Sequence, residues 1–263
     1  MATTVPPDKK DNYEKLFASC IIREVKYPEV DQIISKMVSN KTRYQSVGNP
    51  LNIPWFVIAI IHCMEGSLRF DTHLHNGDPL NKRTVQVPAG RPKTGNPPFT
   101  WEESAKDALT FDKLNLWTDW SIAGMLYKLE LYNGLGYYRQ GINSPYLWSY
   151  SNHYTKGKYV KDGKYDPNAI SKQCGAAVLL RRLGEQQLIS LPDGHIVEQI
   201  LIQGNKTKYY TGTVTNEAKE LQTLLNKAGS VLRVDGKAGE KTSNEYFKFS
   251  NTYLKGDPRR VIV

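Results

Sequence analysis

Long hydrophobic runs are absent from this sequence. The longest apolar stretch, residues 53–61, is well short of the roughly 18 residues that a helix needs to cross a bilayer. We therefore expect no stable membrane insertion. The first residues also lack the basic segment followed by an apolar segment that makes a secretory signal. We expect the protein to be synthesised in the cytoplasm and to stay there at first.

Cysteine is scarce. The three thiols, Cys20, Cys63 and Cys174, are odd in number, far apart in the sequence and outside any C-x-x-C pair. This pattern argues against a disulfide framework and against a zinc site of the finger type. We expect buried free thiols, no metal and no other cofactor.

Acidic residues are fewer than basic ones. The chain has 26 Asp and Glu against 35 Lys and Arg, which gives a net charge of +9. A basic surface favours polyanionic partners such as nucleic acid, anionic lipid or an acidic cell-wall polymer. Because the positive residues are spread along the chain, the charge indicates the sign of the partner but not its identity.

Helical patterns dominate the 263 residues. This length allows one large domain, or a medium domain with a small one attached. The segment 55–65 is apolar nearly all round and is expected to be a central helix, and Thr100 with Glu103 forms a capping box. We expect a mainly α (α+β) fold. Helices are predicted over residues 11–24, 28–39, 55–65, 101–109, 117–132 and 168–183.

Strand signals are few and short. The alternation over residues 84–87 predicts a short strand or hairpin arm, and Asp162-Gly163 predicts a hairpin turn. Residues 185–213 have the pattern of a connector with short strands, and a separate compact unit is expected over residues 214–263. Residues 1–10 are predicted to be a flexible tail.

Glu65 follows the apolar segment directly, and three interpretations of it are open. It could be an exposed helix-end carboxylate, a partner for Arg69 one turn further on, or a general acid. Apolar surroundings and the negative end of a helix both raise the pKa of a carboxyl group. A carboxylic acid that is still protonated near neutral pH can donate its proton to a leaving oxygen, as glycoside cleavage requires.

Three short motifs make a resemblance specific. Glu65-Gly66-Ser67 resembles the Glu-Ser motif of goose-type lysozymes and soluble lytic transglycosylases. Leu131-Tyr132-Asn133-Gly134 is similar to their Ala-Tyr-Asn-Ala-Gly motif, and Gln86 resembles the glutamine of their Gly-Leu-Met-Gln element. Glu65, Gln86 and Tyr132 occur in the order of that family, separated by 21 and 46 residues. The segment from 55 to 183 as a whole resembles lysozyme-like domains of phage endolysins and bacterial cell-wall hydrolases.

The resemblance implies a lysozyme-like helical catalytic domain over residues 11–184, with Glu65 as the acid. Tyr132 would bond near the scissile sugar, Asn133 and Gly134 would shape the floor, and Gln86 would line the groove. Aromatic residues cluster between positions 137 and 154, and such rings commonly stack on sugars. Packing of the loop is the alternative. We expect substrate contacts from Ser67, His75, Gln86, Tyr132, Asn133, Gly134, Tyr138 and Trp148.

A second carboxylate is needed if water is the attacking group. Asp78 is the best candidate, and Asp71 is held in reserve. Asn76-Gly77-Asp78-Pro79 is also ordinary turn chemistry, so Asp78 could instead be structural. His73 and His75 could be metal ligands, but no third ligand has motif spacing, and hydrogen-bonded or groove-lining roles are favoured. His62, one turn before Glu65, is expected to be its neighbour.

The last part of the chain resembles the small helical peptidoglycan-binding module, which has three helices. Leu221-Gln222, Leu225-Asn226, Asp235-Gly236, Gly239 and Thr242 match its pattern, with Gly229 ending a helix and Thr242 starting the next. A helical lid on the main domain is the alternative.

These features together predict a monomeric muramidase, an antimicrobial glycosidase that cleaves the MurNAc–GlcNAc β-1,4 bond of bacterial peptidoglycan and reaches the wall after release or delivery. The alternatives are a lytic transglycosylase, which leaves 1,6-anhydro ends, and a cell-wall glycan-binding protein without catalysis. Nucleic-acid binding rests on charge alone, without a recognition motif, and we expect no nucleic-acid partner.

Overall fold

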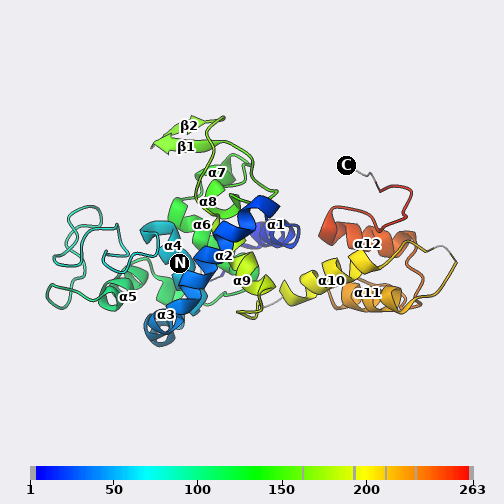
Figure 1. The fold of residues 1–263 in the computed structure, drawn as a ribbon, viewed down its shortest axis with the longest axis horizontal. Helices are drawn as coiled ribbons and strands as arrows, with labels where there is room; N and C mark the ends of the chain where they lie inside the picture. The colour runs from blue at the N-terminus through cyan, green and yellow to red at the C-terminus, as the bar shows by residue number, and fades with distance from the viewer. Residues whose placement is uncertain (1–3, 162, 192–193, 211, 229, 261–263) are drawn as a thin grey trace. The chain divides into compact units, whose positions relative to one another are not determined.

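The structure, a computed structural model, describes residues 4–161, 163–191, 194–210, 212–228 and 230–260. The chain divides into two compact units (Figure 1). The first contains Met1–Lys9 and Cys20–Ile189, and the second contains Lys10–Ser19 and Ser190–Val263. Both are built mainly of helices, and the described residues add one small antiparallel sheet. The prediction of a mainly helical fold with a small β element is confirmed.

The helices follow one another with few regular strands between them. The helix α1 (Pro7–Ala18) has its first residues in the first unit and its later residues in the second. The helices that follow it up to residue 189 are η1 (Glu24–Lys26), α2 (Tyr27–Ser39), α3 (Lys41–Gly48), η2 (Asn49–Leu51), α4 (Trp55–Gly66), α5 (Trp101–Phe111), η3 (Leu114–Leu116), α6 (Ile122–Asn133), α7 (Gly136–Arg139), α8 (Pro145–Trp148) and α9 (Ala176–Glu185). The second unit also contains α10 (Gly194–Lys206), α11 (Asn216–Lys227) and α12 (Glu240–Ser250).

The apolar helix α4 lies at the centre of the first unit, as its sequence predicts. It packs against α2, α3 and α9, and its residues 57–62 are all buried. Ser67 and Leu68 then adopt left-handed backbone conformations, with φ of 50° and 60°. Their amides donate to the carbonyls of Cys63 and His62, which satisfies the end of the helix and turns the chain away from Glu65.

Helix boundaries agree with the sequence where a capping side chain marks them. Thr100 and Glu103 form the predicted capping box of α5. The helix α6 starts at Ile122, after a Ser121 cap, later than the predicted 117. Among the described helices, none alone has the length and apolar content of a membrane span; by length and composition, only residues 41–51 joined with α4 do, across a bend of 114°.

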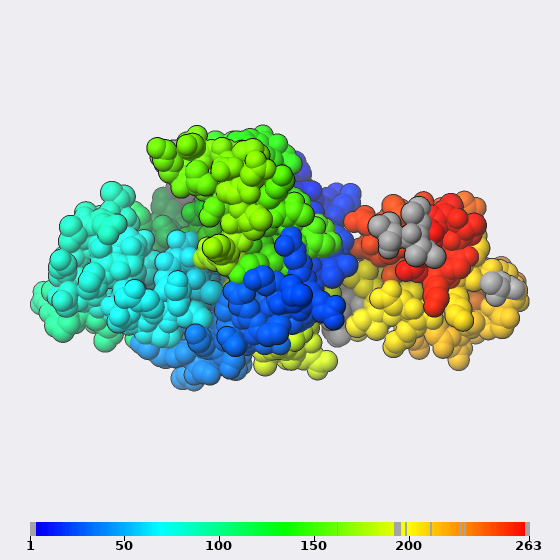
Figure 2. Space-filling model, turned by 45° about the horizontal axis from the view of Figure 1, so that its top comes forward, coloured from blue at the N-terminus to red at the C-terminus, as the bar shows by residue number. Residues whose placement is uncertain are grey.

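Residues 67–100 form a long surface segment with little regular structure, drawn in cyan tones in Figures 1 and 2. The strand predicted over residues 84–87 is absent, and that prediction is wrong. The reason is local: the backbone amides of Val85 and Gln86 donate to the Asp78 carboxylate, at 2.7 and 3.0 Å. Those donors are therefore unavailable to a neighbouring strand.

The small sheet lies further along the chain. Strands β1 (Lys158–Lys161) and β2 (Lys164–Asp166) pair antiparallel, and this confirms the predicted hairpin. Asp162 of the predicted turn lies outside the described residues. The helix α9 starts at Ala176 and not at 168, because the Asp166 carboxylate accepts the amides of Asn168 and Ala169 and so holds the chain in a turn.

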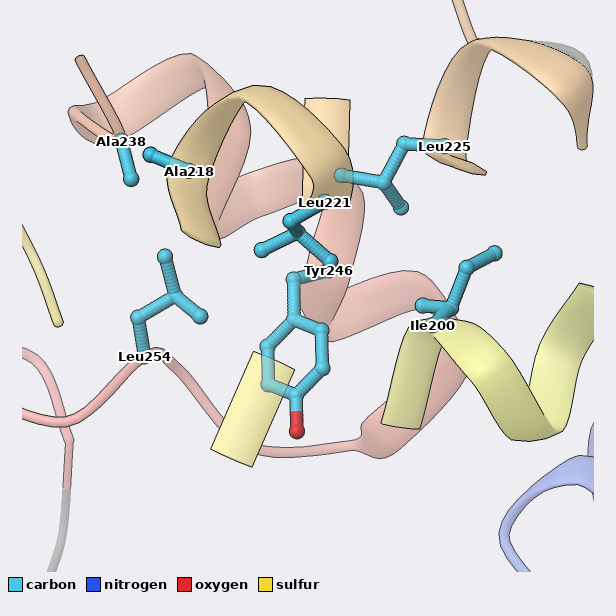
Figure 3. Close-up of a cluster of buried hydrophobic side chains, with 7 residues drawn as sticks. All are labelled: Ile200, Ala218, Leu221, Leu225, Ala238, Tyr246 and Leu254. Atoms are coloured by element: carbon cyan, nitrogen blue, oxygen red, sulfur yellow. The ribbon is translucent and has the colours of Figure 1, made fainter. Parts of the chain in front are cut away.

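The second unit has its own hydrophobic core (Figure 3). Tyr246 of α12 lies beside Leu221 and Leu225 of α11 in this view, with Ile200 of α10 close by. Gly204 permits the approach, because a Cβ there would lie 1.9 Å from the Tyr246 ring. Where short strands were predicted within residues 185–213, the structure has the helix α10, and that prediction is wrong. The apolar residues at positions 196 and 200 are four apart, which places them on one face of a helix.

Candidate functional site

Glu65 lies in the last turn of α4, where part of its side chain is open to solvent. The Tyr146 hydroxyl of α8 donates to its Oε1 at 2.7 Å. Arg69, the alternative partner considered from the sequence, pairs with Asp71 at 3.2 Å, and both side chains are exposed. The second interpretation of Glu65, an ion pair with Arg69, is thus not the arrangement seen.

The surroundings of Glu65 favour its protonated form. Protein atoms around the carboxyl group remove part of its hydration, and this burial raises its pKa even though one side of the group is exposed. The hydrogen bond from Tyr146 lowers the pKa, and the negative charge of Asp112 raises it again. The net shift is upward, as a proton donor near neutral pH requires.

Asp112 is the site residue that the sequence reasoning missed. It follows the last residue of α5 as its C-cap, its side chain is exposed, and the Tyr132 hydroxyl of α6 lies near enough to influence its pKa. Partial burial of the carboxyl group by protein atoms raises the pKa of Asp112, and it outweighs the lowering by Tyr132 and by the positive charges of Lys128 and Arg91. Its carboxylate acts electrostatically on Glu65. No motif marks it, because only the packing of separate helices brings it there.

The cluster is therefore built from four helix ends. Glu65 comes from α4, Asp112 from the end of α5, Tyr132 from α6 and Tyr146 from α8. Burial raises the pKa of both tyrosines, and the neighbouring carboxylates raise it further. Both hydroxyls thus keep their protons and can only act on the carboxylates as donors. The arrangement is two carboxyl groups, of which Glu65 is held by Tyr146 and Asp112 lies in the electrostatic reach of Tyr132.

The end of α4 is fixed by a buried histidine. His62 Nε2 lies 2.9 Å from the Arg69 carbonyl and Nδ1 lies 3.1 Å from the Tyr44 hydroxyl. Burial lowers the pKa of His62 to about 4, so the ring is neutral, with Nε2 as donor and Nδ1 as acceptor. Gln173 adds a second tie by donating to the Met64 carbonyl at 2.8 Å. These bonds place Glu65 without touching its carboxylate.

Asp78, the second carboxylate predicted from the sequence, organises its own loop. One oxygen accepts from the amides of Val85 and Gln86 and from Asn76 Nδ2, and the other lies 3.3 Å from Gln86 Nε2. These bonds, from Gln86 first, lower the pKa of Asp78. The turn chemistry considered as its alternative accounts for this residue, and Asp71 is engaged with Arg69. We carry neither into the proposed reaction.

The two histidines of the loop are hydrogen-bonded. His73 Nδ1 lies 2.7 Å from Ser104 Oγ and Nε2 lies 2.8 Å from the Lys82 carbonyl. His75 Nε2 lies 2.8 Å from Asp107, which also pairs with Arg91. Within the described part of the chain, no group of three His, Cys, Asp or Glu side chains could hold a metal ion.

The remaining predicted contacts differ in accessibility. Ser67, Gln86, Asn133 and Gly134 are exposed. Tyr138 is half-buried, and the Lys9 ammonium lies 3.9 Å from its ring centre. Trp148 has only 1% of its surface exposed and meets the His153 ring edge to face. Trp148 belongs to the core in this structure, and its ring is not open to a sugar.

The motif of the second unit is explained by polar contacts. The Gln222 Nε2 lies 3.0 Å from Asp235 Oδ1, 3.2 Å from the Lys237 carbonyl and 3.2 Å from Thr242 Oγ1. The Gly236 amide donates to Gln222 Oε1 at 2.9 Å. These residues hold the loop between α11 and α12 and so have a structural role. A separate hollow of about 440 Å³ lies between α10 and α11, with Ile202 and Leu224 in its lining.

Comparison of the chain with models of known protein families, with curated proteins and with solved structures found no match. The likeness to goose-type lysozymes thus rests on the short motifs alone. Of these, Glu65 and Tyr132 meet in one cluster, while Gln86 bonds to Asp78 in the loop.

Proposed function

We propose that this chain cleaves the β-1,4 bond between N-acetylmuramic acid and N-acetylglucosamine in bacterial peptidoglycan, with Glu65 as the general acid. The observation that carries the proposal is an exposed carboxyl group with a raised pKa, held by Tyr146 beside a second carboxylate. Protonation of the leaving oxygen is the step for which such a group is suited.

Different side chains orient the acid, hold its helix in place and contact the sugar in the proposed reaction. Tyr146 orients the Glu65 carboxyl group through Oε1, which leaves Oε2 for the glycosidic oxygen. His62 and Gln173 hold the end of α4, so the acid is positioned by a buried network and not by a flexible loop. Asn133 and Gly134, exposed just after Tyr132, are available for contacts with the sugar. The basic surface suits the carboxylates and phosphates of bacterial walls.

The second unit is proposed to assist as a wall-binding module. Its support is the motif resemblance together with a hollow between α10 and α11. The alternative of a glycan-binding protein without catalysis shares all of these features except the need for a proton at Glu65.

The first prediction separates catalysis from binding. Glu65→Gln keeps the shape of the side chain but cannot donate an acidic proton, so we expect turbidity clearing of purified peptidoglycan to fall by about 10²–10⁴-fold. The matched control is Glu29→Gln, because Glu29 is also exposed and also accepts from a tyrosine, Tyr150, at 2.7 Å. It should clear walls at the native rate. Clearing by Glu65→Gln at that rate, or none by the native protein, would contradict the proposal.

A further inference from the structure

The hairpin formed by β1 and β2 concentrates positive charge. Residues 156–164 contain four lysines against one aspartate, a surplus of three positive charges in a chain whose net charge is +9. Figure 1 shows both strands at the edge of the first unit, beyond α7. We propose that this hairpin binds a linear phosphodiester polymer through its lysines. Only the source of the polymer, the bacterial wall, rests on the function proposed above.

The strand register places two lysines directly opposite each other. Lys161 of β1 pairs with Lys164 of β2, and both are exposed. By contrast, Lys158 pairs with Asp166. Directly opposed side chains have Cβ atoms about 4.5–5.5 Å apart, so like charges there repel. Among the described residues no carboxylate bonds to either lysine of the opposed pair; Asp162, in the turn, lies outside them. An anion bound between the two ammonium groups removes the repulsion.

The hairpin keeps this arrangement because contacts at its other end anchor it. The Tyr159 amide donates to the Tyr137 hydroxyl at 2.8 Å, and the Gly157 amide donates to the Ala169 carbonyl at 2.8 Å. The Tyr159 ring meets the rings of Tyr137 and Tyr165 edge to face, with centroids 5.1 and 5.4 Å away. These contacts hold the strands without neutralising the lysines, so the ammonium groups are available to an anion from solvent.

The tyrosine contacts also favour a polymer without aromatic groups. Proteins that bind single-stranded nucleic acid combine cations with aromatic rings on which the bases stack. In the hairpin, Tyr137 is buried, while Tyr159 and Tyr165 are half-buried and pack against each other. The hairpin therefore offers ammonium groups to solvent and no open ring for a base. Lysine binds phosphate as a point charge, which suits the repeated phosphodiester groups of a wall polymer.

The test is isothermal titration calorimetry with purified poly(glycerol phosphate), which contains no peptidoglycan, in about 0.15 M salt. Lys164→Glu removes one attraction and adds one repulsion. Since a unit charge about 4 Å from another changes affinity about fivefold in water, we expect the Kd to rise about 10–30-fold. Lys36→Glu is the matched control, because Lys36 is exposed on α2 and the net charge changes equally. Its Kd should stay within about twofold, since charges more than about 8 Å away are screened.

Melting temperatures separate binding from a structural role. Lys164→Glu places opposite charges across the strands at the pair with Lys161, so the melting temperature should stay level or rise while affinity falls. Lys161→Glu should do the same from the other strand.

Two kinds of result would overturn the role of the hairpin. One is no binding by the native protein, or an equal Kd for native protein, Lys164→Glu and Lys36→Glu. The other is tighter binding of single-stranded DNA than of poly(glycerol phosphate). None of these bears on cleavage by Glu65. A native protein that binds the polymer with the expected lysine dependence but clears no wall would instead overturn only the proposed function.

Discussion

Gly66 shows how a single residue shapes the site. It stands between Glu65 and Ser67, whereas the Glu-Ser motif that this segment resembles has serine directly after glutamate. A Cβ on Gly66 would lie 3.0 Å from His62 Cδ2 and 3.4 Å from Nε2, closer than a packed ring tolerates without moving. The ring cannot move freely, because it bonds to the Arg69 carbonyl and to Tyr44. The glycine therefore makes room for the histidine that anchors the acid.

At this scale the hydrogen bond between Tyr146 and Glu65 predicts a pH effect. The bond stabilises the ionised carboxylate and lowers the pKa of Glu65. Tyr146→Phe removes it, so the pKa should rise. Because the protonated form of Glu65 is the active one in the proposed reaction, activity should be lost as pH increases through that pKa. The alkaline limb of the pH–rate profile should therefore move to higher pH.

The measurement is the rate of muropeptide release across the pH range for native protein and Tyr146→Phe. Tyr150→Phe is the control, since Tyr150 donates to Glu29 and lies in a different contact. It should leave the alkaline limb in place. A limb that moves to lower pH in Tyr146→Phe would contradict the assignment of Glu65 as the acid.

At the scale of elements, α11 illustrates how a motif can be structural. Leu221 and Leu225 face the core of the second unit, and Gln222 and Asn226, each one residue further on, reach the following loop. Asn226 exchanges two hydrogen bonds with the backbone of Leu232, at 2.6 and 2.7 Å. The alternation of apolar and amide residues thus fixes a helix and a loop together.

Gln222→Leu tests this role of α11. The leucine keeps a similar volume but leaves the buried Gly236 amide and the Thr242 hydroxyl without their partner. We expect the free energy of unfolding to fall by about 2–4 kcal/mol, because unsatisfied buried polar groups cost about 1–3 kcal/mol each. Urea denaturation of the full chain followed by circular dichroism measures it.

The control for this variant is Thr223→Ala on the same helix. Thr223 is exposed, and its hydroxyl donates only within α11, to the Lys219 carbonyl. Its loss should change stability by less than about 0.5 kcal/mol, the range usual for surface substitutions. Equal stability of native protein and Gln222→Leu would show that the amide network contributes nothing.

At the scale of the whole molecule, the net charge of +9 predicts an electrostatic contribution to the proposed binding of the bacterial wall. Adsorption of the native protein to purified sacculi should weaken steeply between about 0.01 M and about 1 M NaCl, because the Debye length falls from about 30 to about 3 Å. A pelleting assay with the inactive Glu65→Gln variant measures adsorption without digestion. Sacculi stripped of anionic polymers provide the comparison, and salt-independent adsorption would rule out an electrostatic contribution.

The sequence by itself determined the helices whose signals are local. The apolar run of α4, the capping box of α5, the hairpin turn and the face of α11 all act over a few residues, so their patterns are visible in the chain. It also marked Glu65, because a carboxyl group at the end of an apolar helix is unusual. The alternating pattern over residues 84–87 predicted a strand that is absent, because the Asp78 carboxylate accepts the backbone amides of residues 85 and 86.

Only the tertiary structure decided which groups surround Glu65. Asp112, Tyr132 and Tyr146 lie 47, 67 and 81 positions further along the chain, and no local pattern links them to it. They meet because α4, α5, α6 and α8 end in the same region. Packing also buries Trp148 in the core, and the Asp78 carboxylate accepts hydrogen bonds from the backbone of its own loop. A pKa depends on such neighbours and on burial, which are properties of the folded chain and not of its order of residues.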